Sequence, residues 1–284
     1  MNHWVLDSDR ISFKTDPTKL YDQLHTLHMG GIPLSNWWQW EGCSFSQLKE
    51  LVLSRNFMNF EGTLQIVAAA SNLQLLEFHE LEELVADSTT LEPALKLDQG
   101  FKVLRMRQVS FEALFQELKW VVPGAWETEL IVDPESFPHD SPSAPLFPNG
   151  STVTTLSLIN KTGDYPSLVI QAILKAFPNV QTLTLDGFNL TRSILSAITR
   201  SPNVVEGQFP RLSVLRLHSS RLFDYDTFMA MVMSHPIRRL EIWHSELQWN
   251  IETRAYAPVE LSPLYPWLRE RVPEIYIVGP YIET

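Results

Sequence analysis

The stretch LKELVLSRNFM, from Leu48 to Met58, decides the fold. Its apolar residues follow the pattern L-x-x-L-x-L-x-x-N-x-L. The middle of the pattern alternates, so that Leu51 and Leu53 point to the same side of an extended chain. One short strand cannot bury its apolar side alone. The pattern therefore predicts that similar strands occur elsewhere in the chain and stack beside this one.

The same frame recurs along the whole chain. The other nine occurrences are LHTLHMGGIPL from Leu24, LQLLEFHELEE from Leu73, FKVLRMRQVSF from Phe101, the weak ETELIVDPESF from Glu127, VTTLSLINKTG from Val153, VQTLTLDGFNL from Val180, LSVLRLHSSRL from Leu212, IRRLEIWHSEL from Ile237 and VPEIYIVGPYI from Val272. The fourth and sixth positions are apolar in every frame. The fourth positions run from Leu27 to Ile275 in nine steps of about 28 residues, near the upper end of the spacing of leucine-rich repeats.

Helical spacing of apolar residues separates many of these frames. It occurs in LVIQAILKAF from Leu168, SILSAITR from Ser193, TFMAMVMSH from Thr227, FEALFQELKWV from Phe111 and LSPLYPWLRERV from Leu261. A strand followed by a helix, repeated, predicts an α/β leucine-rich-repeat solenoid, or horseshoe. Its parallel strands should lie on the concave side and its helices on the convex side. Leu183 and Leu185 should then point inward, while Thr182, Thr184 and Asp186 point outward.

The expected organisation is one leucine-rich-repeat domain of about ten irregular repeats over residues 21–284. Residues 1–20 are expected to be a cap or the remnant of a preceding domain, and VLDSDRISF within them is a candidate extra strand. Residues 133–150 contain five prolines, which no regular helix tolerates, so a loop should replace the helix there. A domain boundary at this loop is the alternative.

The asparagine position of the frame holds Asn only at Asn56. Elsewhere it holds Ser220, Ser245 or an apolar residue such as Val109 or Phe188. A continuous ladder of asparagine side chains is therefore not expected, and the turns must satisfy their backbone groups in other ways.

The bulk composition limits the partners. The formal net charge of -11 disfavours nucleic acid as the main partner. The single cysteine, Cys43, fits a reducing compartment. Neither a signal peptide nor an apolar run of the ~20 residues that span a membrane is present in the sequence. We therefore expect a cytoplasmic or nuclear protein that does not act on membranes.

The sequence contains no recognisable catalytic motif. It has no nucleophile elbow, no phosphate-binding glycine loop and no dinucleotide fingerprint. His25 and His28 are three residues apart on a predicted strand, which places them on opposite faces and disfavours a shared metal. We therefore expect no enzyme activity, no cofactor and no metal site.

The concave face is the expected binding surface, because solenoids usually bind there. Arginine and tryptophan are the residue types that most often anchor protein interfaces. The candidate protein-binding residues are Arg105, Arg107, Asp186, Arg216, His218, Arg239, Glu241 and Trp243. Three clustered tryptophans, at positions 37, 38 and 40, and Trp249 are further interface candidates. The expected partner is a protein whose identity the sequence does not give.

These frames resemble the leucine-rich-repeat region of fungal F-box proteins. The features shared with that family are the long irregular repeats, the P-x-L starts FPNVQTLTL and FPRLSVLRL, the many tryptophans and the terminal VPEIYIVG. The resemblance covers residues 20–284 and implies the substrate-recognition arm of a cullin-type ubiquitin ligase. The F-box start L-P-x-E-[IL] is not found in the chain, so binding of the Skp adaptor is doubtful and no residue is assigned to it. We expect a truncated chain or a paralogue that retains only the recognition arm.

Two other functions are compatible with the same repeats. One is a regulatory horseshoe such as a GTPase-activating protein, whose repeats are usually more regular and carry an asparagine ladder. The other is a purely structural scaffold.

Overall fold

The computed structural model describes residues 3–7, 23–30, 45–54, 66–79, 101–110, 128–136, 153–160, 166–203, 205, 207–245, 249–250, 255–256 and 264–278. These residues form a mixed α/β structure of parallel strands and helices. The chain divides into two compact units. Unit 1 contains Met1–Ser136 and Phe147–Thr152, and unit 2 contains Phe137–Leu146 and Val153–Thr284.

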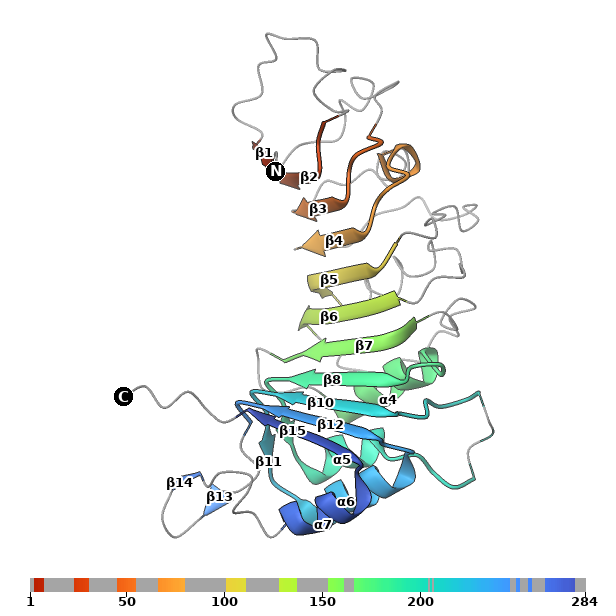
Figure 1. Cartoon of the computed structure of the whole chain (residues 1–284), viewed down its shortest axis with the longest axis vertical. Coiled ribbons are helices and arrows are strands. Elements are labelled where there is room, and N and C mark those ends of the chain that lie inside the picture. The colour runs from red at the N-terminus through yellow and green to blue at the C-terminus, as the bar shows by residue number, and fades with distance from the viewer. Residues whose placement is uncertain are drawn as a thin grey trace. The chain divides into compact units, whose positions relative to one another are not determined.

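Unit 1 is built on parallel strands that follow one another in chain order. They are β1 (His3–Asp7), β2 (Thr26–Gly30), β3 (Glu50–Ser54), β4 (Leu75–His79), β5 (Val103–Ser110) and β6 (Thr128–Ser136). Each strand pairs in parallel with the next one along the chain (Figure 1).

Unit 2 repeats this order with helices between the strands. Its parallel strands are β7 (Val153–Ile159), β8 (Thr182–Asp186), β10 (Val214–His218), β12 (Arg239–Trp243) and β15 (Glu274–Val278). The connecting helices are α4 (Ser167–Ala176), α5 (Arg192–Ile198), α6 (Tyr225–Ser234) and α7 (Leu264–Arg271). Two small pairs complete the unit: parallel β9 (Asn189–Leu190) with β11 (Arg221–Leu222), and antiparallel β13 (Trp249–Asn250) with β14 (Ala255–Tyr256).

The pairing register confirms the repeat frame. Each of the ten predicted frames contains one of the parallel strands β2–β8, β10, β12 and β15, and within each unit the fourth frame positions are paired with one another. In unit 1 these are Leu27, Leu51, Leu76, Leu104 and Leu130, and in unit 2 Leu156, Leu183, Leu215, Leu240 and Ile275. Parallel strands need a long crossover connection, which the spacing of about 28 residues provides.

The extra strand expected near the N-terminus exists as β1, although it starts two residues before VLDSDRISF. The predicted start of the loop over residues 133–150 was wrong, because β6 continues to Ser136 in spite of Pro134. The rest of that segment, and the helix expected from Phe111, lie outside the described residues.

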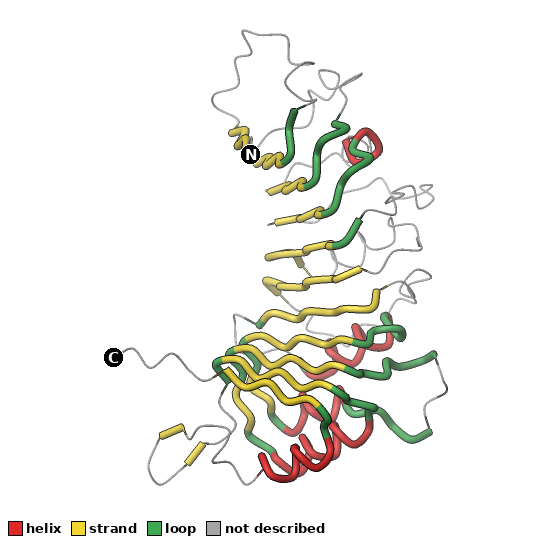
Figure 2. Tube along the Cα trace, viewed as in Figure 1, coloured by secondary structure: helices red, strands yellow, loops and turns green. Residues whose placement is uncertain are grey.

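The core of unit 2 lies between its strands and its helices. The helices lie together along one side of the strands (Figure 2). Leu183, Leu185, Leu215 and Leu217 are fully buried on that side, as the alternation predicts. Helix α4 contributes Ile170, Ile173 and Leu174 to this core at helical spacing. Helix α6 begins with a side-chain cap, since Asp224 Oδ1 accepts a hydrogen bond of 2.9 Å from the Thr227 amide.

Serine takes the place that asparagine holds in the repeat frame. Ser220 Oγ donates to the carbonyl oxygens of Leu185 and His218, and it accepts a hydrogen bond from the Phe188 amide. Ser245 Oγ makes the corresponding bonds one repeat later, to the carbonyls of Leu217 and Trp243 and from the Ser220 amide. This serine ladder pairs buried backbone groups that would otherwise be costly to bury.

In three successive repeats, the residue before the ninth frame position has a left-handed backbone. Gly187 has φ 75°, Ser219 has φ 46° and His244 has φ 49°. The amide of each of these residues donates a hydrogen bond of 2.9–3.0 Å to the carbonyl oxygen of the last strand residue in the next repeat. The turn geometry is therefore repeated, although only one of the three positions holds the residue type that tolerates it without cost.

We predict that Ser219→Gly raises the stability of the protein by about 0.5–1 kcal/mol, because glycine relieves the left-handed strain at an exposed turn. The hydrogen bond from the Ser219 amide to the Trp243 carbonyl oxygen would be kept. Thermal unfolding of Ser219→Gly and of the control Ser219→Ala measures the effect. A melting temperature of the glycine variant below that of the wild type would show that the turn is not strained.

His235 connects the ends of two helices in unit 2. It follows α6, and its ring is buried against Phe209. Nε2 lies 2.9 Å from the Ile198 carbonyl oxygen, where it donates, and Nδ1 accepts from the Leu212 amide at 3.4 Å. Burial lowers the pKa of His235 below 6.5, against the opposing effect of the Ile198 carbonyl.

We predict that the free energy of unfolding decreases in acid because of His235. The unfolded chain takes up a proton at its usual pKa near 6.5, whereas the folded ring stays neutral to lower pH. The stability from the neutral ring is complete above that value and is lost as the pH falls toward the lower pKa of the folded state. Denaturant unfolding at pH 7.5 and 5.5 should show a smaller pH effect for His235→Gln than for the wild type. An equal effect in both proteins would exclude this role for His235.

Candidate protein-binding face

The strands of unit 2 carry their polar side chains on the side opposite to the buried leucines. Register places these residues in three rows that run across the strands. We call them the polar face; they are Thr155, Thr182, Val214, Arg239 and Glu274 in the first row, Ser157, Thr184, Arg216, Glu241 and Tyr276 in the second, and Ile159, Asp186, His218, Trp243 and Val278 in the third. Side chains one row apart belong to residues two apart on a strand, so neighbouring rows are within contact distance.

A carboxylate between two arginines forms the centre of this face. Arg239 Nε lies 2.6 Å from Glu241 Oε1, and Arg216 Nε lies 3.3 Å from Glu241 Oε2. The Glu241 side chain is only 6% exposed. Burial of a lone carboxylate is costly, so the two guanidinium groups are needed to compensate it. The arrangement follows from register, because Glu241 is paired with Arg216 and Arg239 is two residues earlier on the same strand face.

The two arginines differ in how they are held. The guanidinium of Arg239 lies 4.5 Å above the ring of Tyr276, and its Nη1 is 4.0 Å from Glu274 Oε2. The guanidinium of Arg239 therefore lies close to three side chains, those of Glu241, Glu274 and Tyr276. Arg216 lies near Glu241 at Nε without forming a hydrogen bond there, and among the described residues it has no ion pair with a second carboxylate. Its side chain is 35% exposed, although Nε itself is buried.

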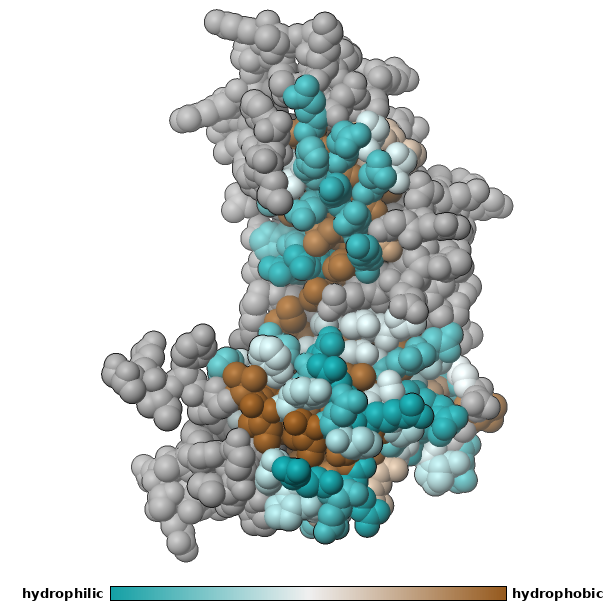
Figure 3. All heavy atoms as spheres, viewed as in Figure 1, coloured by the Kyte–Doolittle hydropathy of each residue, from teal (hydrophilic) through white to brown (hydrophobic). Residues whose placement is uncertain are grey.

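Exposed apolar side chains lie beside this cluster. Trp243 is 41% exposed, Tyr276 47% and Val278 41%, and the register pairs Trp243 with Val278. Figure 3 shows hydrophobic atoms exposed over the last strands of unit 2. On its other side Trp243 contacts His218, with ring centroids 5.6 Å apart. Burial lowers the pKa of His218, and the nearby Asp186 opposes this effect, so the ring is mainly neutral at neutral pH.

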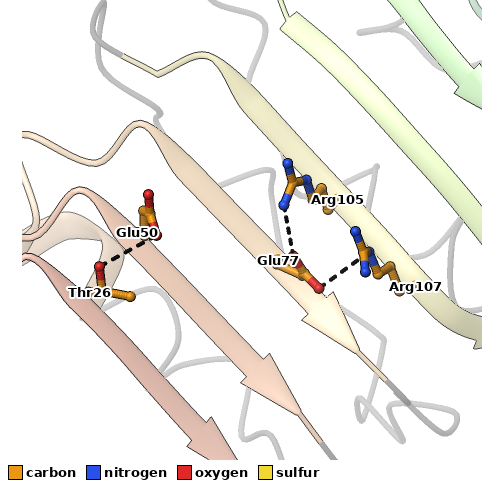
Figure 4. Close-up of polar contacts among 5 residues, drawn as sticks. All are labelled: Thr26, Glu50, Glu77, Arg105 and Arg107. Atoms are coloured by element: carbon orange, nitrogen blue, oxygen red, sulfur yellow. Dashed lines mark hydrogen bonds and ion pairs between the residues drawn. The ribbon is translucent and has the colours of Figure 1, made fainter. Parts of the chain in front are cut away.

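Unit 1 contains a similar cluster. Glu77 on β4 lies 3.4 Å from Arg105 Nη1 and 3.4 Å from Arg107 Nε, both on β5 (Figure 4). Thr26 and Glu50, also on neighbouring strands, make a hydrogen bond of 3.4 Å. Unit 1 therefore also has one shielded carboxylate between two half-exposed arginines.

The structure places the predicted residues in two groups. Asp186, Arg216, His218, Arg239, Glu241 and Trp243 lie together on the polar face of unit 2, while Arg105 and Arg107 lie around Glu77 in unit 1. Glu77, Glu274, Tyr276 and Val278 were missed. They hold odd-numbered positions of the third and tenth frames, so the alternation that selected the other residues also identifies them. The tryptophans at 37, 38 and 40 and the side chain of Trp249 lie outside the described residues.

In the part of the chain that the structure describes, no group of three or more histidine, cysteine or acidic side chains is arranged to hold a metal ion. None of the described helices has both the length and the apolar character needed to cross a bilayer. Comparison of the chain with family models, with curated proteins and with solved structures gave no match in any of the three.

Proposed function

We propose that this chain is a non-enzymatic protein-interaction module, built as a leucine-rich-repeat solenoid whose concave side contains the polar face. The parallel strands paired through their fourth frame positions support the solenoid, as do the helices on one side of unit 2. A partner protein would bind across the strands, as it does in other solenoids.

The single observation that carries this proposal is the exposure of Trp243, Tyr276 and Val278 beside the Arg216–Glu241–Arg239 cluster. Aromatic and arginine side chains dominate the binding energy of protein interfaces. Here they are attached to paired strands rather than to loops, so little conformational entropy is lost on binding. A strand face of a purely structural scaffold has no need for exposed aromatic groups.

The partner expected from the F-box resemblance is a protein destined for ubiquitination. This part of the proposal rests on the repeat frames and on the terminal VPEIYIVG, whose strand carries Tyr276 and Val278. The residues of the polar face support binding of a protein, whether or not that protein is a ligase substrate.

Quantitative affinity capture tests the proposal. The immobilised wild-type chain, the face variant Trp243→Ala/Tyr276→Ala and the control variant Leu168→Ala/Met233→Ala are each incubated with lysate of the source cells. Leu168 and Met233 are exposed apolar residues on α4 and α6, so the control removes comparable surface from the helical side.

We expect the wild type and the control to capture the same protein in equal amounts. The face variant should capture at least tenfold less of it. The purified partner should bind the wild-type chain again. All three chains must first show the same melting temperature. Loss of binding in the helical control, with retention in the face variant, would contradict the proposed surface.

A further inference from the structure

We infer that the segment of the partner that binds the polar face carries a carboxylate, held by the terminal nitrogens of Arg216, next to an apolar side chain that packs on Trp243. This inference rests on the proposed function and specifies the chemistry of the same face. It follows from the different ways in which the two arginines around Glu241 are held.

The terminal nitrogens of Arg216 are the available donors of the cluster. Glu241 approaches Arg216 at Nε, at 3.3 Å, and among the described residues no other side chain forms an ion pair with the Arg216 guanidinium. A guanidinium has five N–H donors in a rigid fork, and the terminal edge matches the two oxygens of a carboxylate. The ion pair with Glu241 limits the conformations of the Arg216 side chain before a ligand binds.

The charges around Arg216 favour a carboxylate over a more highly charged anion. Glu241 lies 3.3 Å from Nε of the same guanidinium, and Asp186 lies on the adjacent strand one row away. A phosphate group, with nearly two negative charges, would be repelled by both carboxylates. A single negative charge that binds in the plane of the fork makes two charge-assisted hydrogen bonds with less repulsion.

The third row of the polar face accounts for the apolar neighbour. Trp243 and Val278 are paired and more than a third exposed, and they lie one row from Arg216 and Tyr276. A side chain packed on the Trp243 indole would exclude water from the adjacent arginine. The hydrogen bonds to the carboxylate would then form in a less polar environment, where they are stronger.

Selection from a random peptide library tests the inference without a known ligand. Twelve-residue peptides displayed on phage, with no free C-terminus, are selected on the wild-type chain and on Arg216→Gln, Trp243→Ala and Arg238→Gln. Arg238 is exposed and next in sequence to Arg239, so Arg238→Gln removes the same charge outside the polar face. A second library with free C-termini distinguishes an acidic side chain from a terminal carboxylate.

The expected result is enrichment of Asp or Glu beside an apolar residue on the wild type and on Arg238→Gln. Arg216→Gln should lose the acidic enrichment, and Trp243→Ala should lose the apolar one. A selected peptide should weaken about tenfold on the wild type when its acid is changed to the amide, but less than about threefold on Arg216→Gln, because the two changes remove the same interaction. Arg216→Lys, which keeps the charge without the fork, should restore only part of the affinity.

Two outcomes separate this inference from the proposed function. Peptides that require Trp243 but carry no acidic residue in either library would overturn the carboxylate and leave the binding face intact. Peptides whose selection is unaffected by Trp243→Ala and by Arg216→Gln alike would overturn both. Equal melting temperatures of the four chains show that lost binding is not lost folding, and Arg239, 2.6 Å from Glu241, still pairs with that carboxylate when Arg216 is replaced.

Discussion

Leu183→Asp is expected to unfold unit 2. Leu183 has no solvent exposure, and its pairing partners Leu156 and Leu215 are equally buried. An aspartate there would place a charge among apolar side chains with no partner to compensate it. The cost should reach about 4 kcal/mol or more, which is a large fraction of the stability of an ordinary domain.

Thr182→Asp is the matched control. It introduces the same side chain one residue away, on the half-buried opposite face of β8. We expect the control to remain folded with a melting temperature close to that of the wild type, whereas Leu183→Asp should be insoluble or lack a cooperative transition. A cooperative transition of Leu183→Asp within a few degrees of the wild type would contradict the register of β8.

Gly187→Ala is expected to have the second-largest effect. Gly187 has φ 75°, and a Cβ atom there would lie only 2.5 Å from the backbone carbonyl oxygen of Asn160. Backbone has little freedom to move away, since the Asn160 amide is itself bonded to the Asp186 carbonyl at 2.8 Å. The left-handed strain and the steric clash together should cost about 2–4 kcal/mol.

Gly207→Ala separates these two contributions. Gly207 also has a positive φ, 85°, but a Cβ atom there meets nothing within 4 Å. Its substitution should cost about 1 kcal/mol or less, because only the conformational strain remains. Chemical denaturation of both variants measures the difference. Equal losses for the two glycines would show that the approach of Asn160 does not constrain the turn.

The strand positions could be predicted from the sequence because their signal is local. Leu183 and Leu185 are apolar with polar residues on both sides, and that alternation has one physical explanation, a strand with one buried face. The same reasoning placed Arg216, His218 and Trp243 on the opposite face. Helices α4, α5, α6 and α7 were predicted from apolar residues at helical spacing.

The contacts within the polar face could not be predicted in the same way. The frame pairs Arg216 with Glu241, but it does not give the side-chain conformations that bring the guanidinium groups of Arg216 and Arg239 to the Glu241 carboxylate. The left-handed turn was also hidden, because Ser219 is not a residue type that marks such a backbone. Serine in the ladder carries no distinctive signal either, since serine is common in ordinary turns.

Site-specific photo-crosslinking tests the central claim most directly. A photoreactive amino acid is placed at Val278, on the exposed part of the polar face, or at Leu168, on the exposed side of α4, and each chain is irradiated in lysate of the source cells. We expect a discrete crosslinked protein from position 278, abolished by Trp243→Ala/Tyr276→Ala, and none from position 168. A discrete product from position 168 alone would contradict the assignment of binding to the polar face.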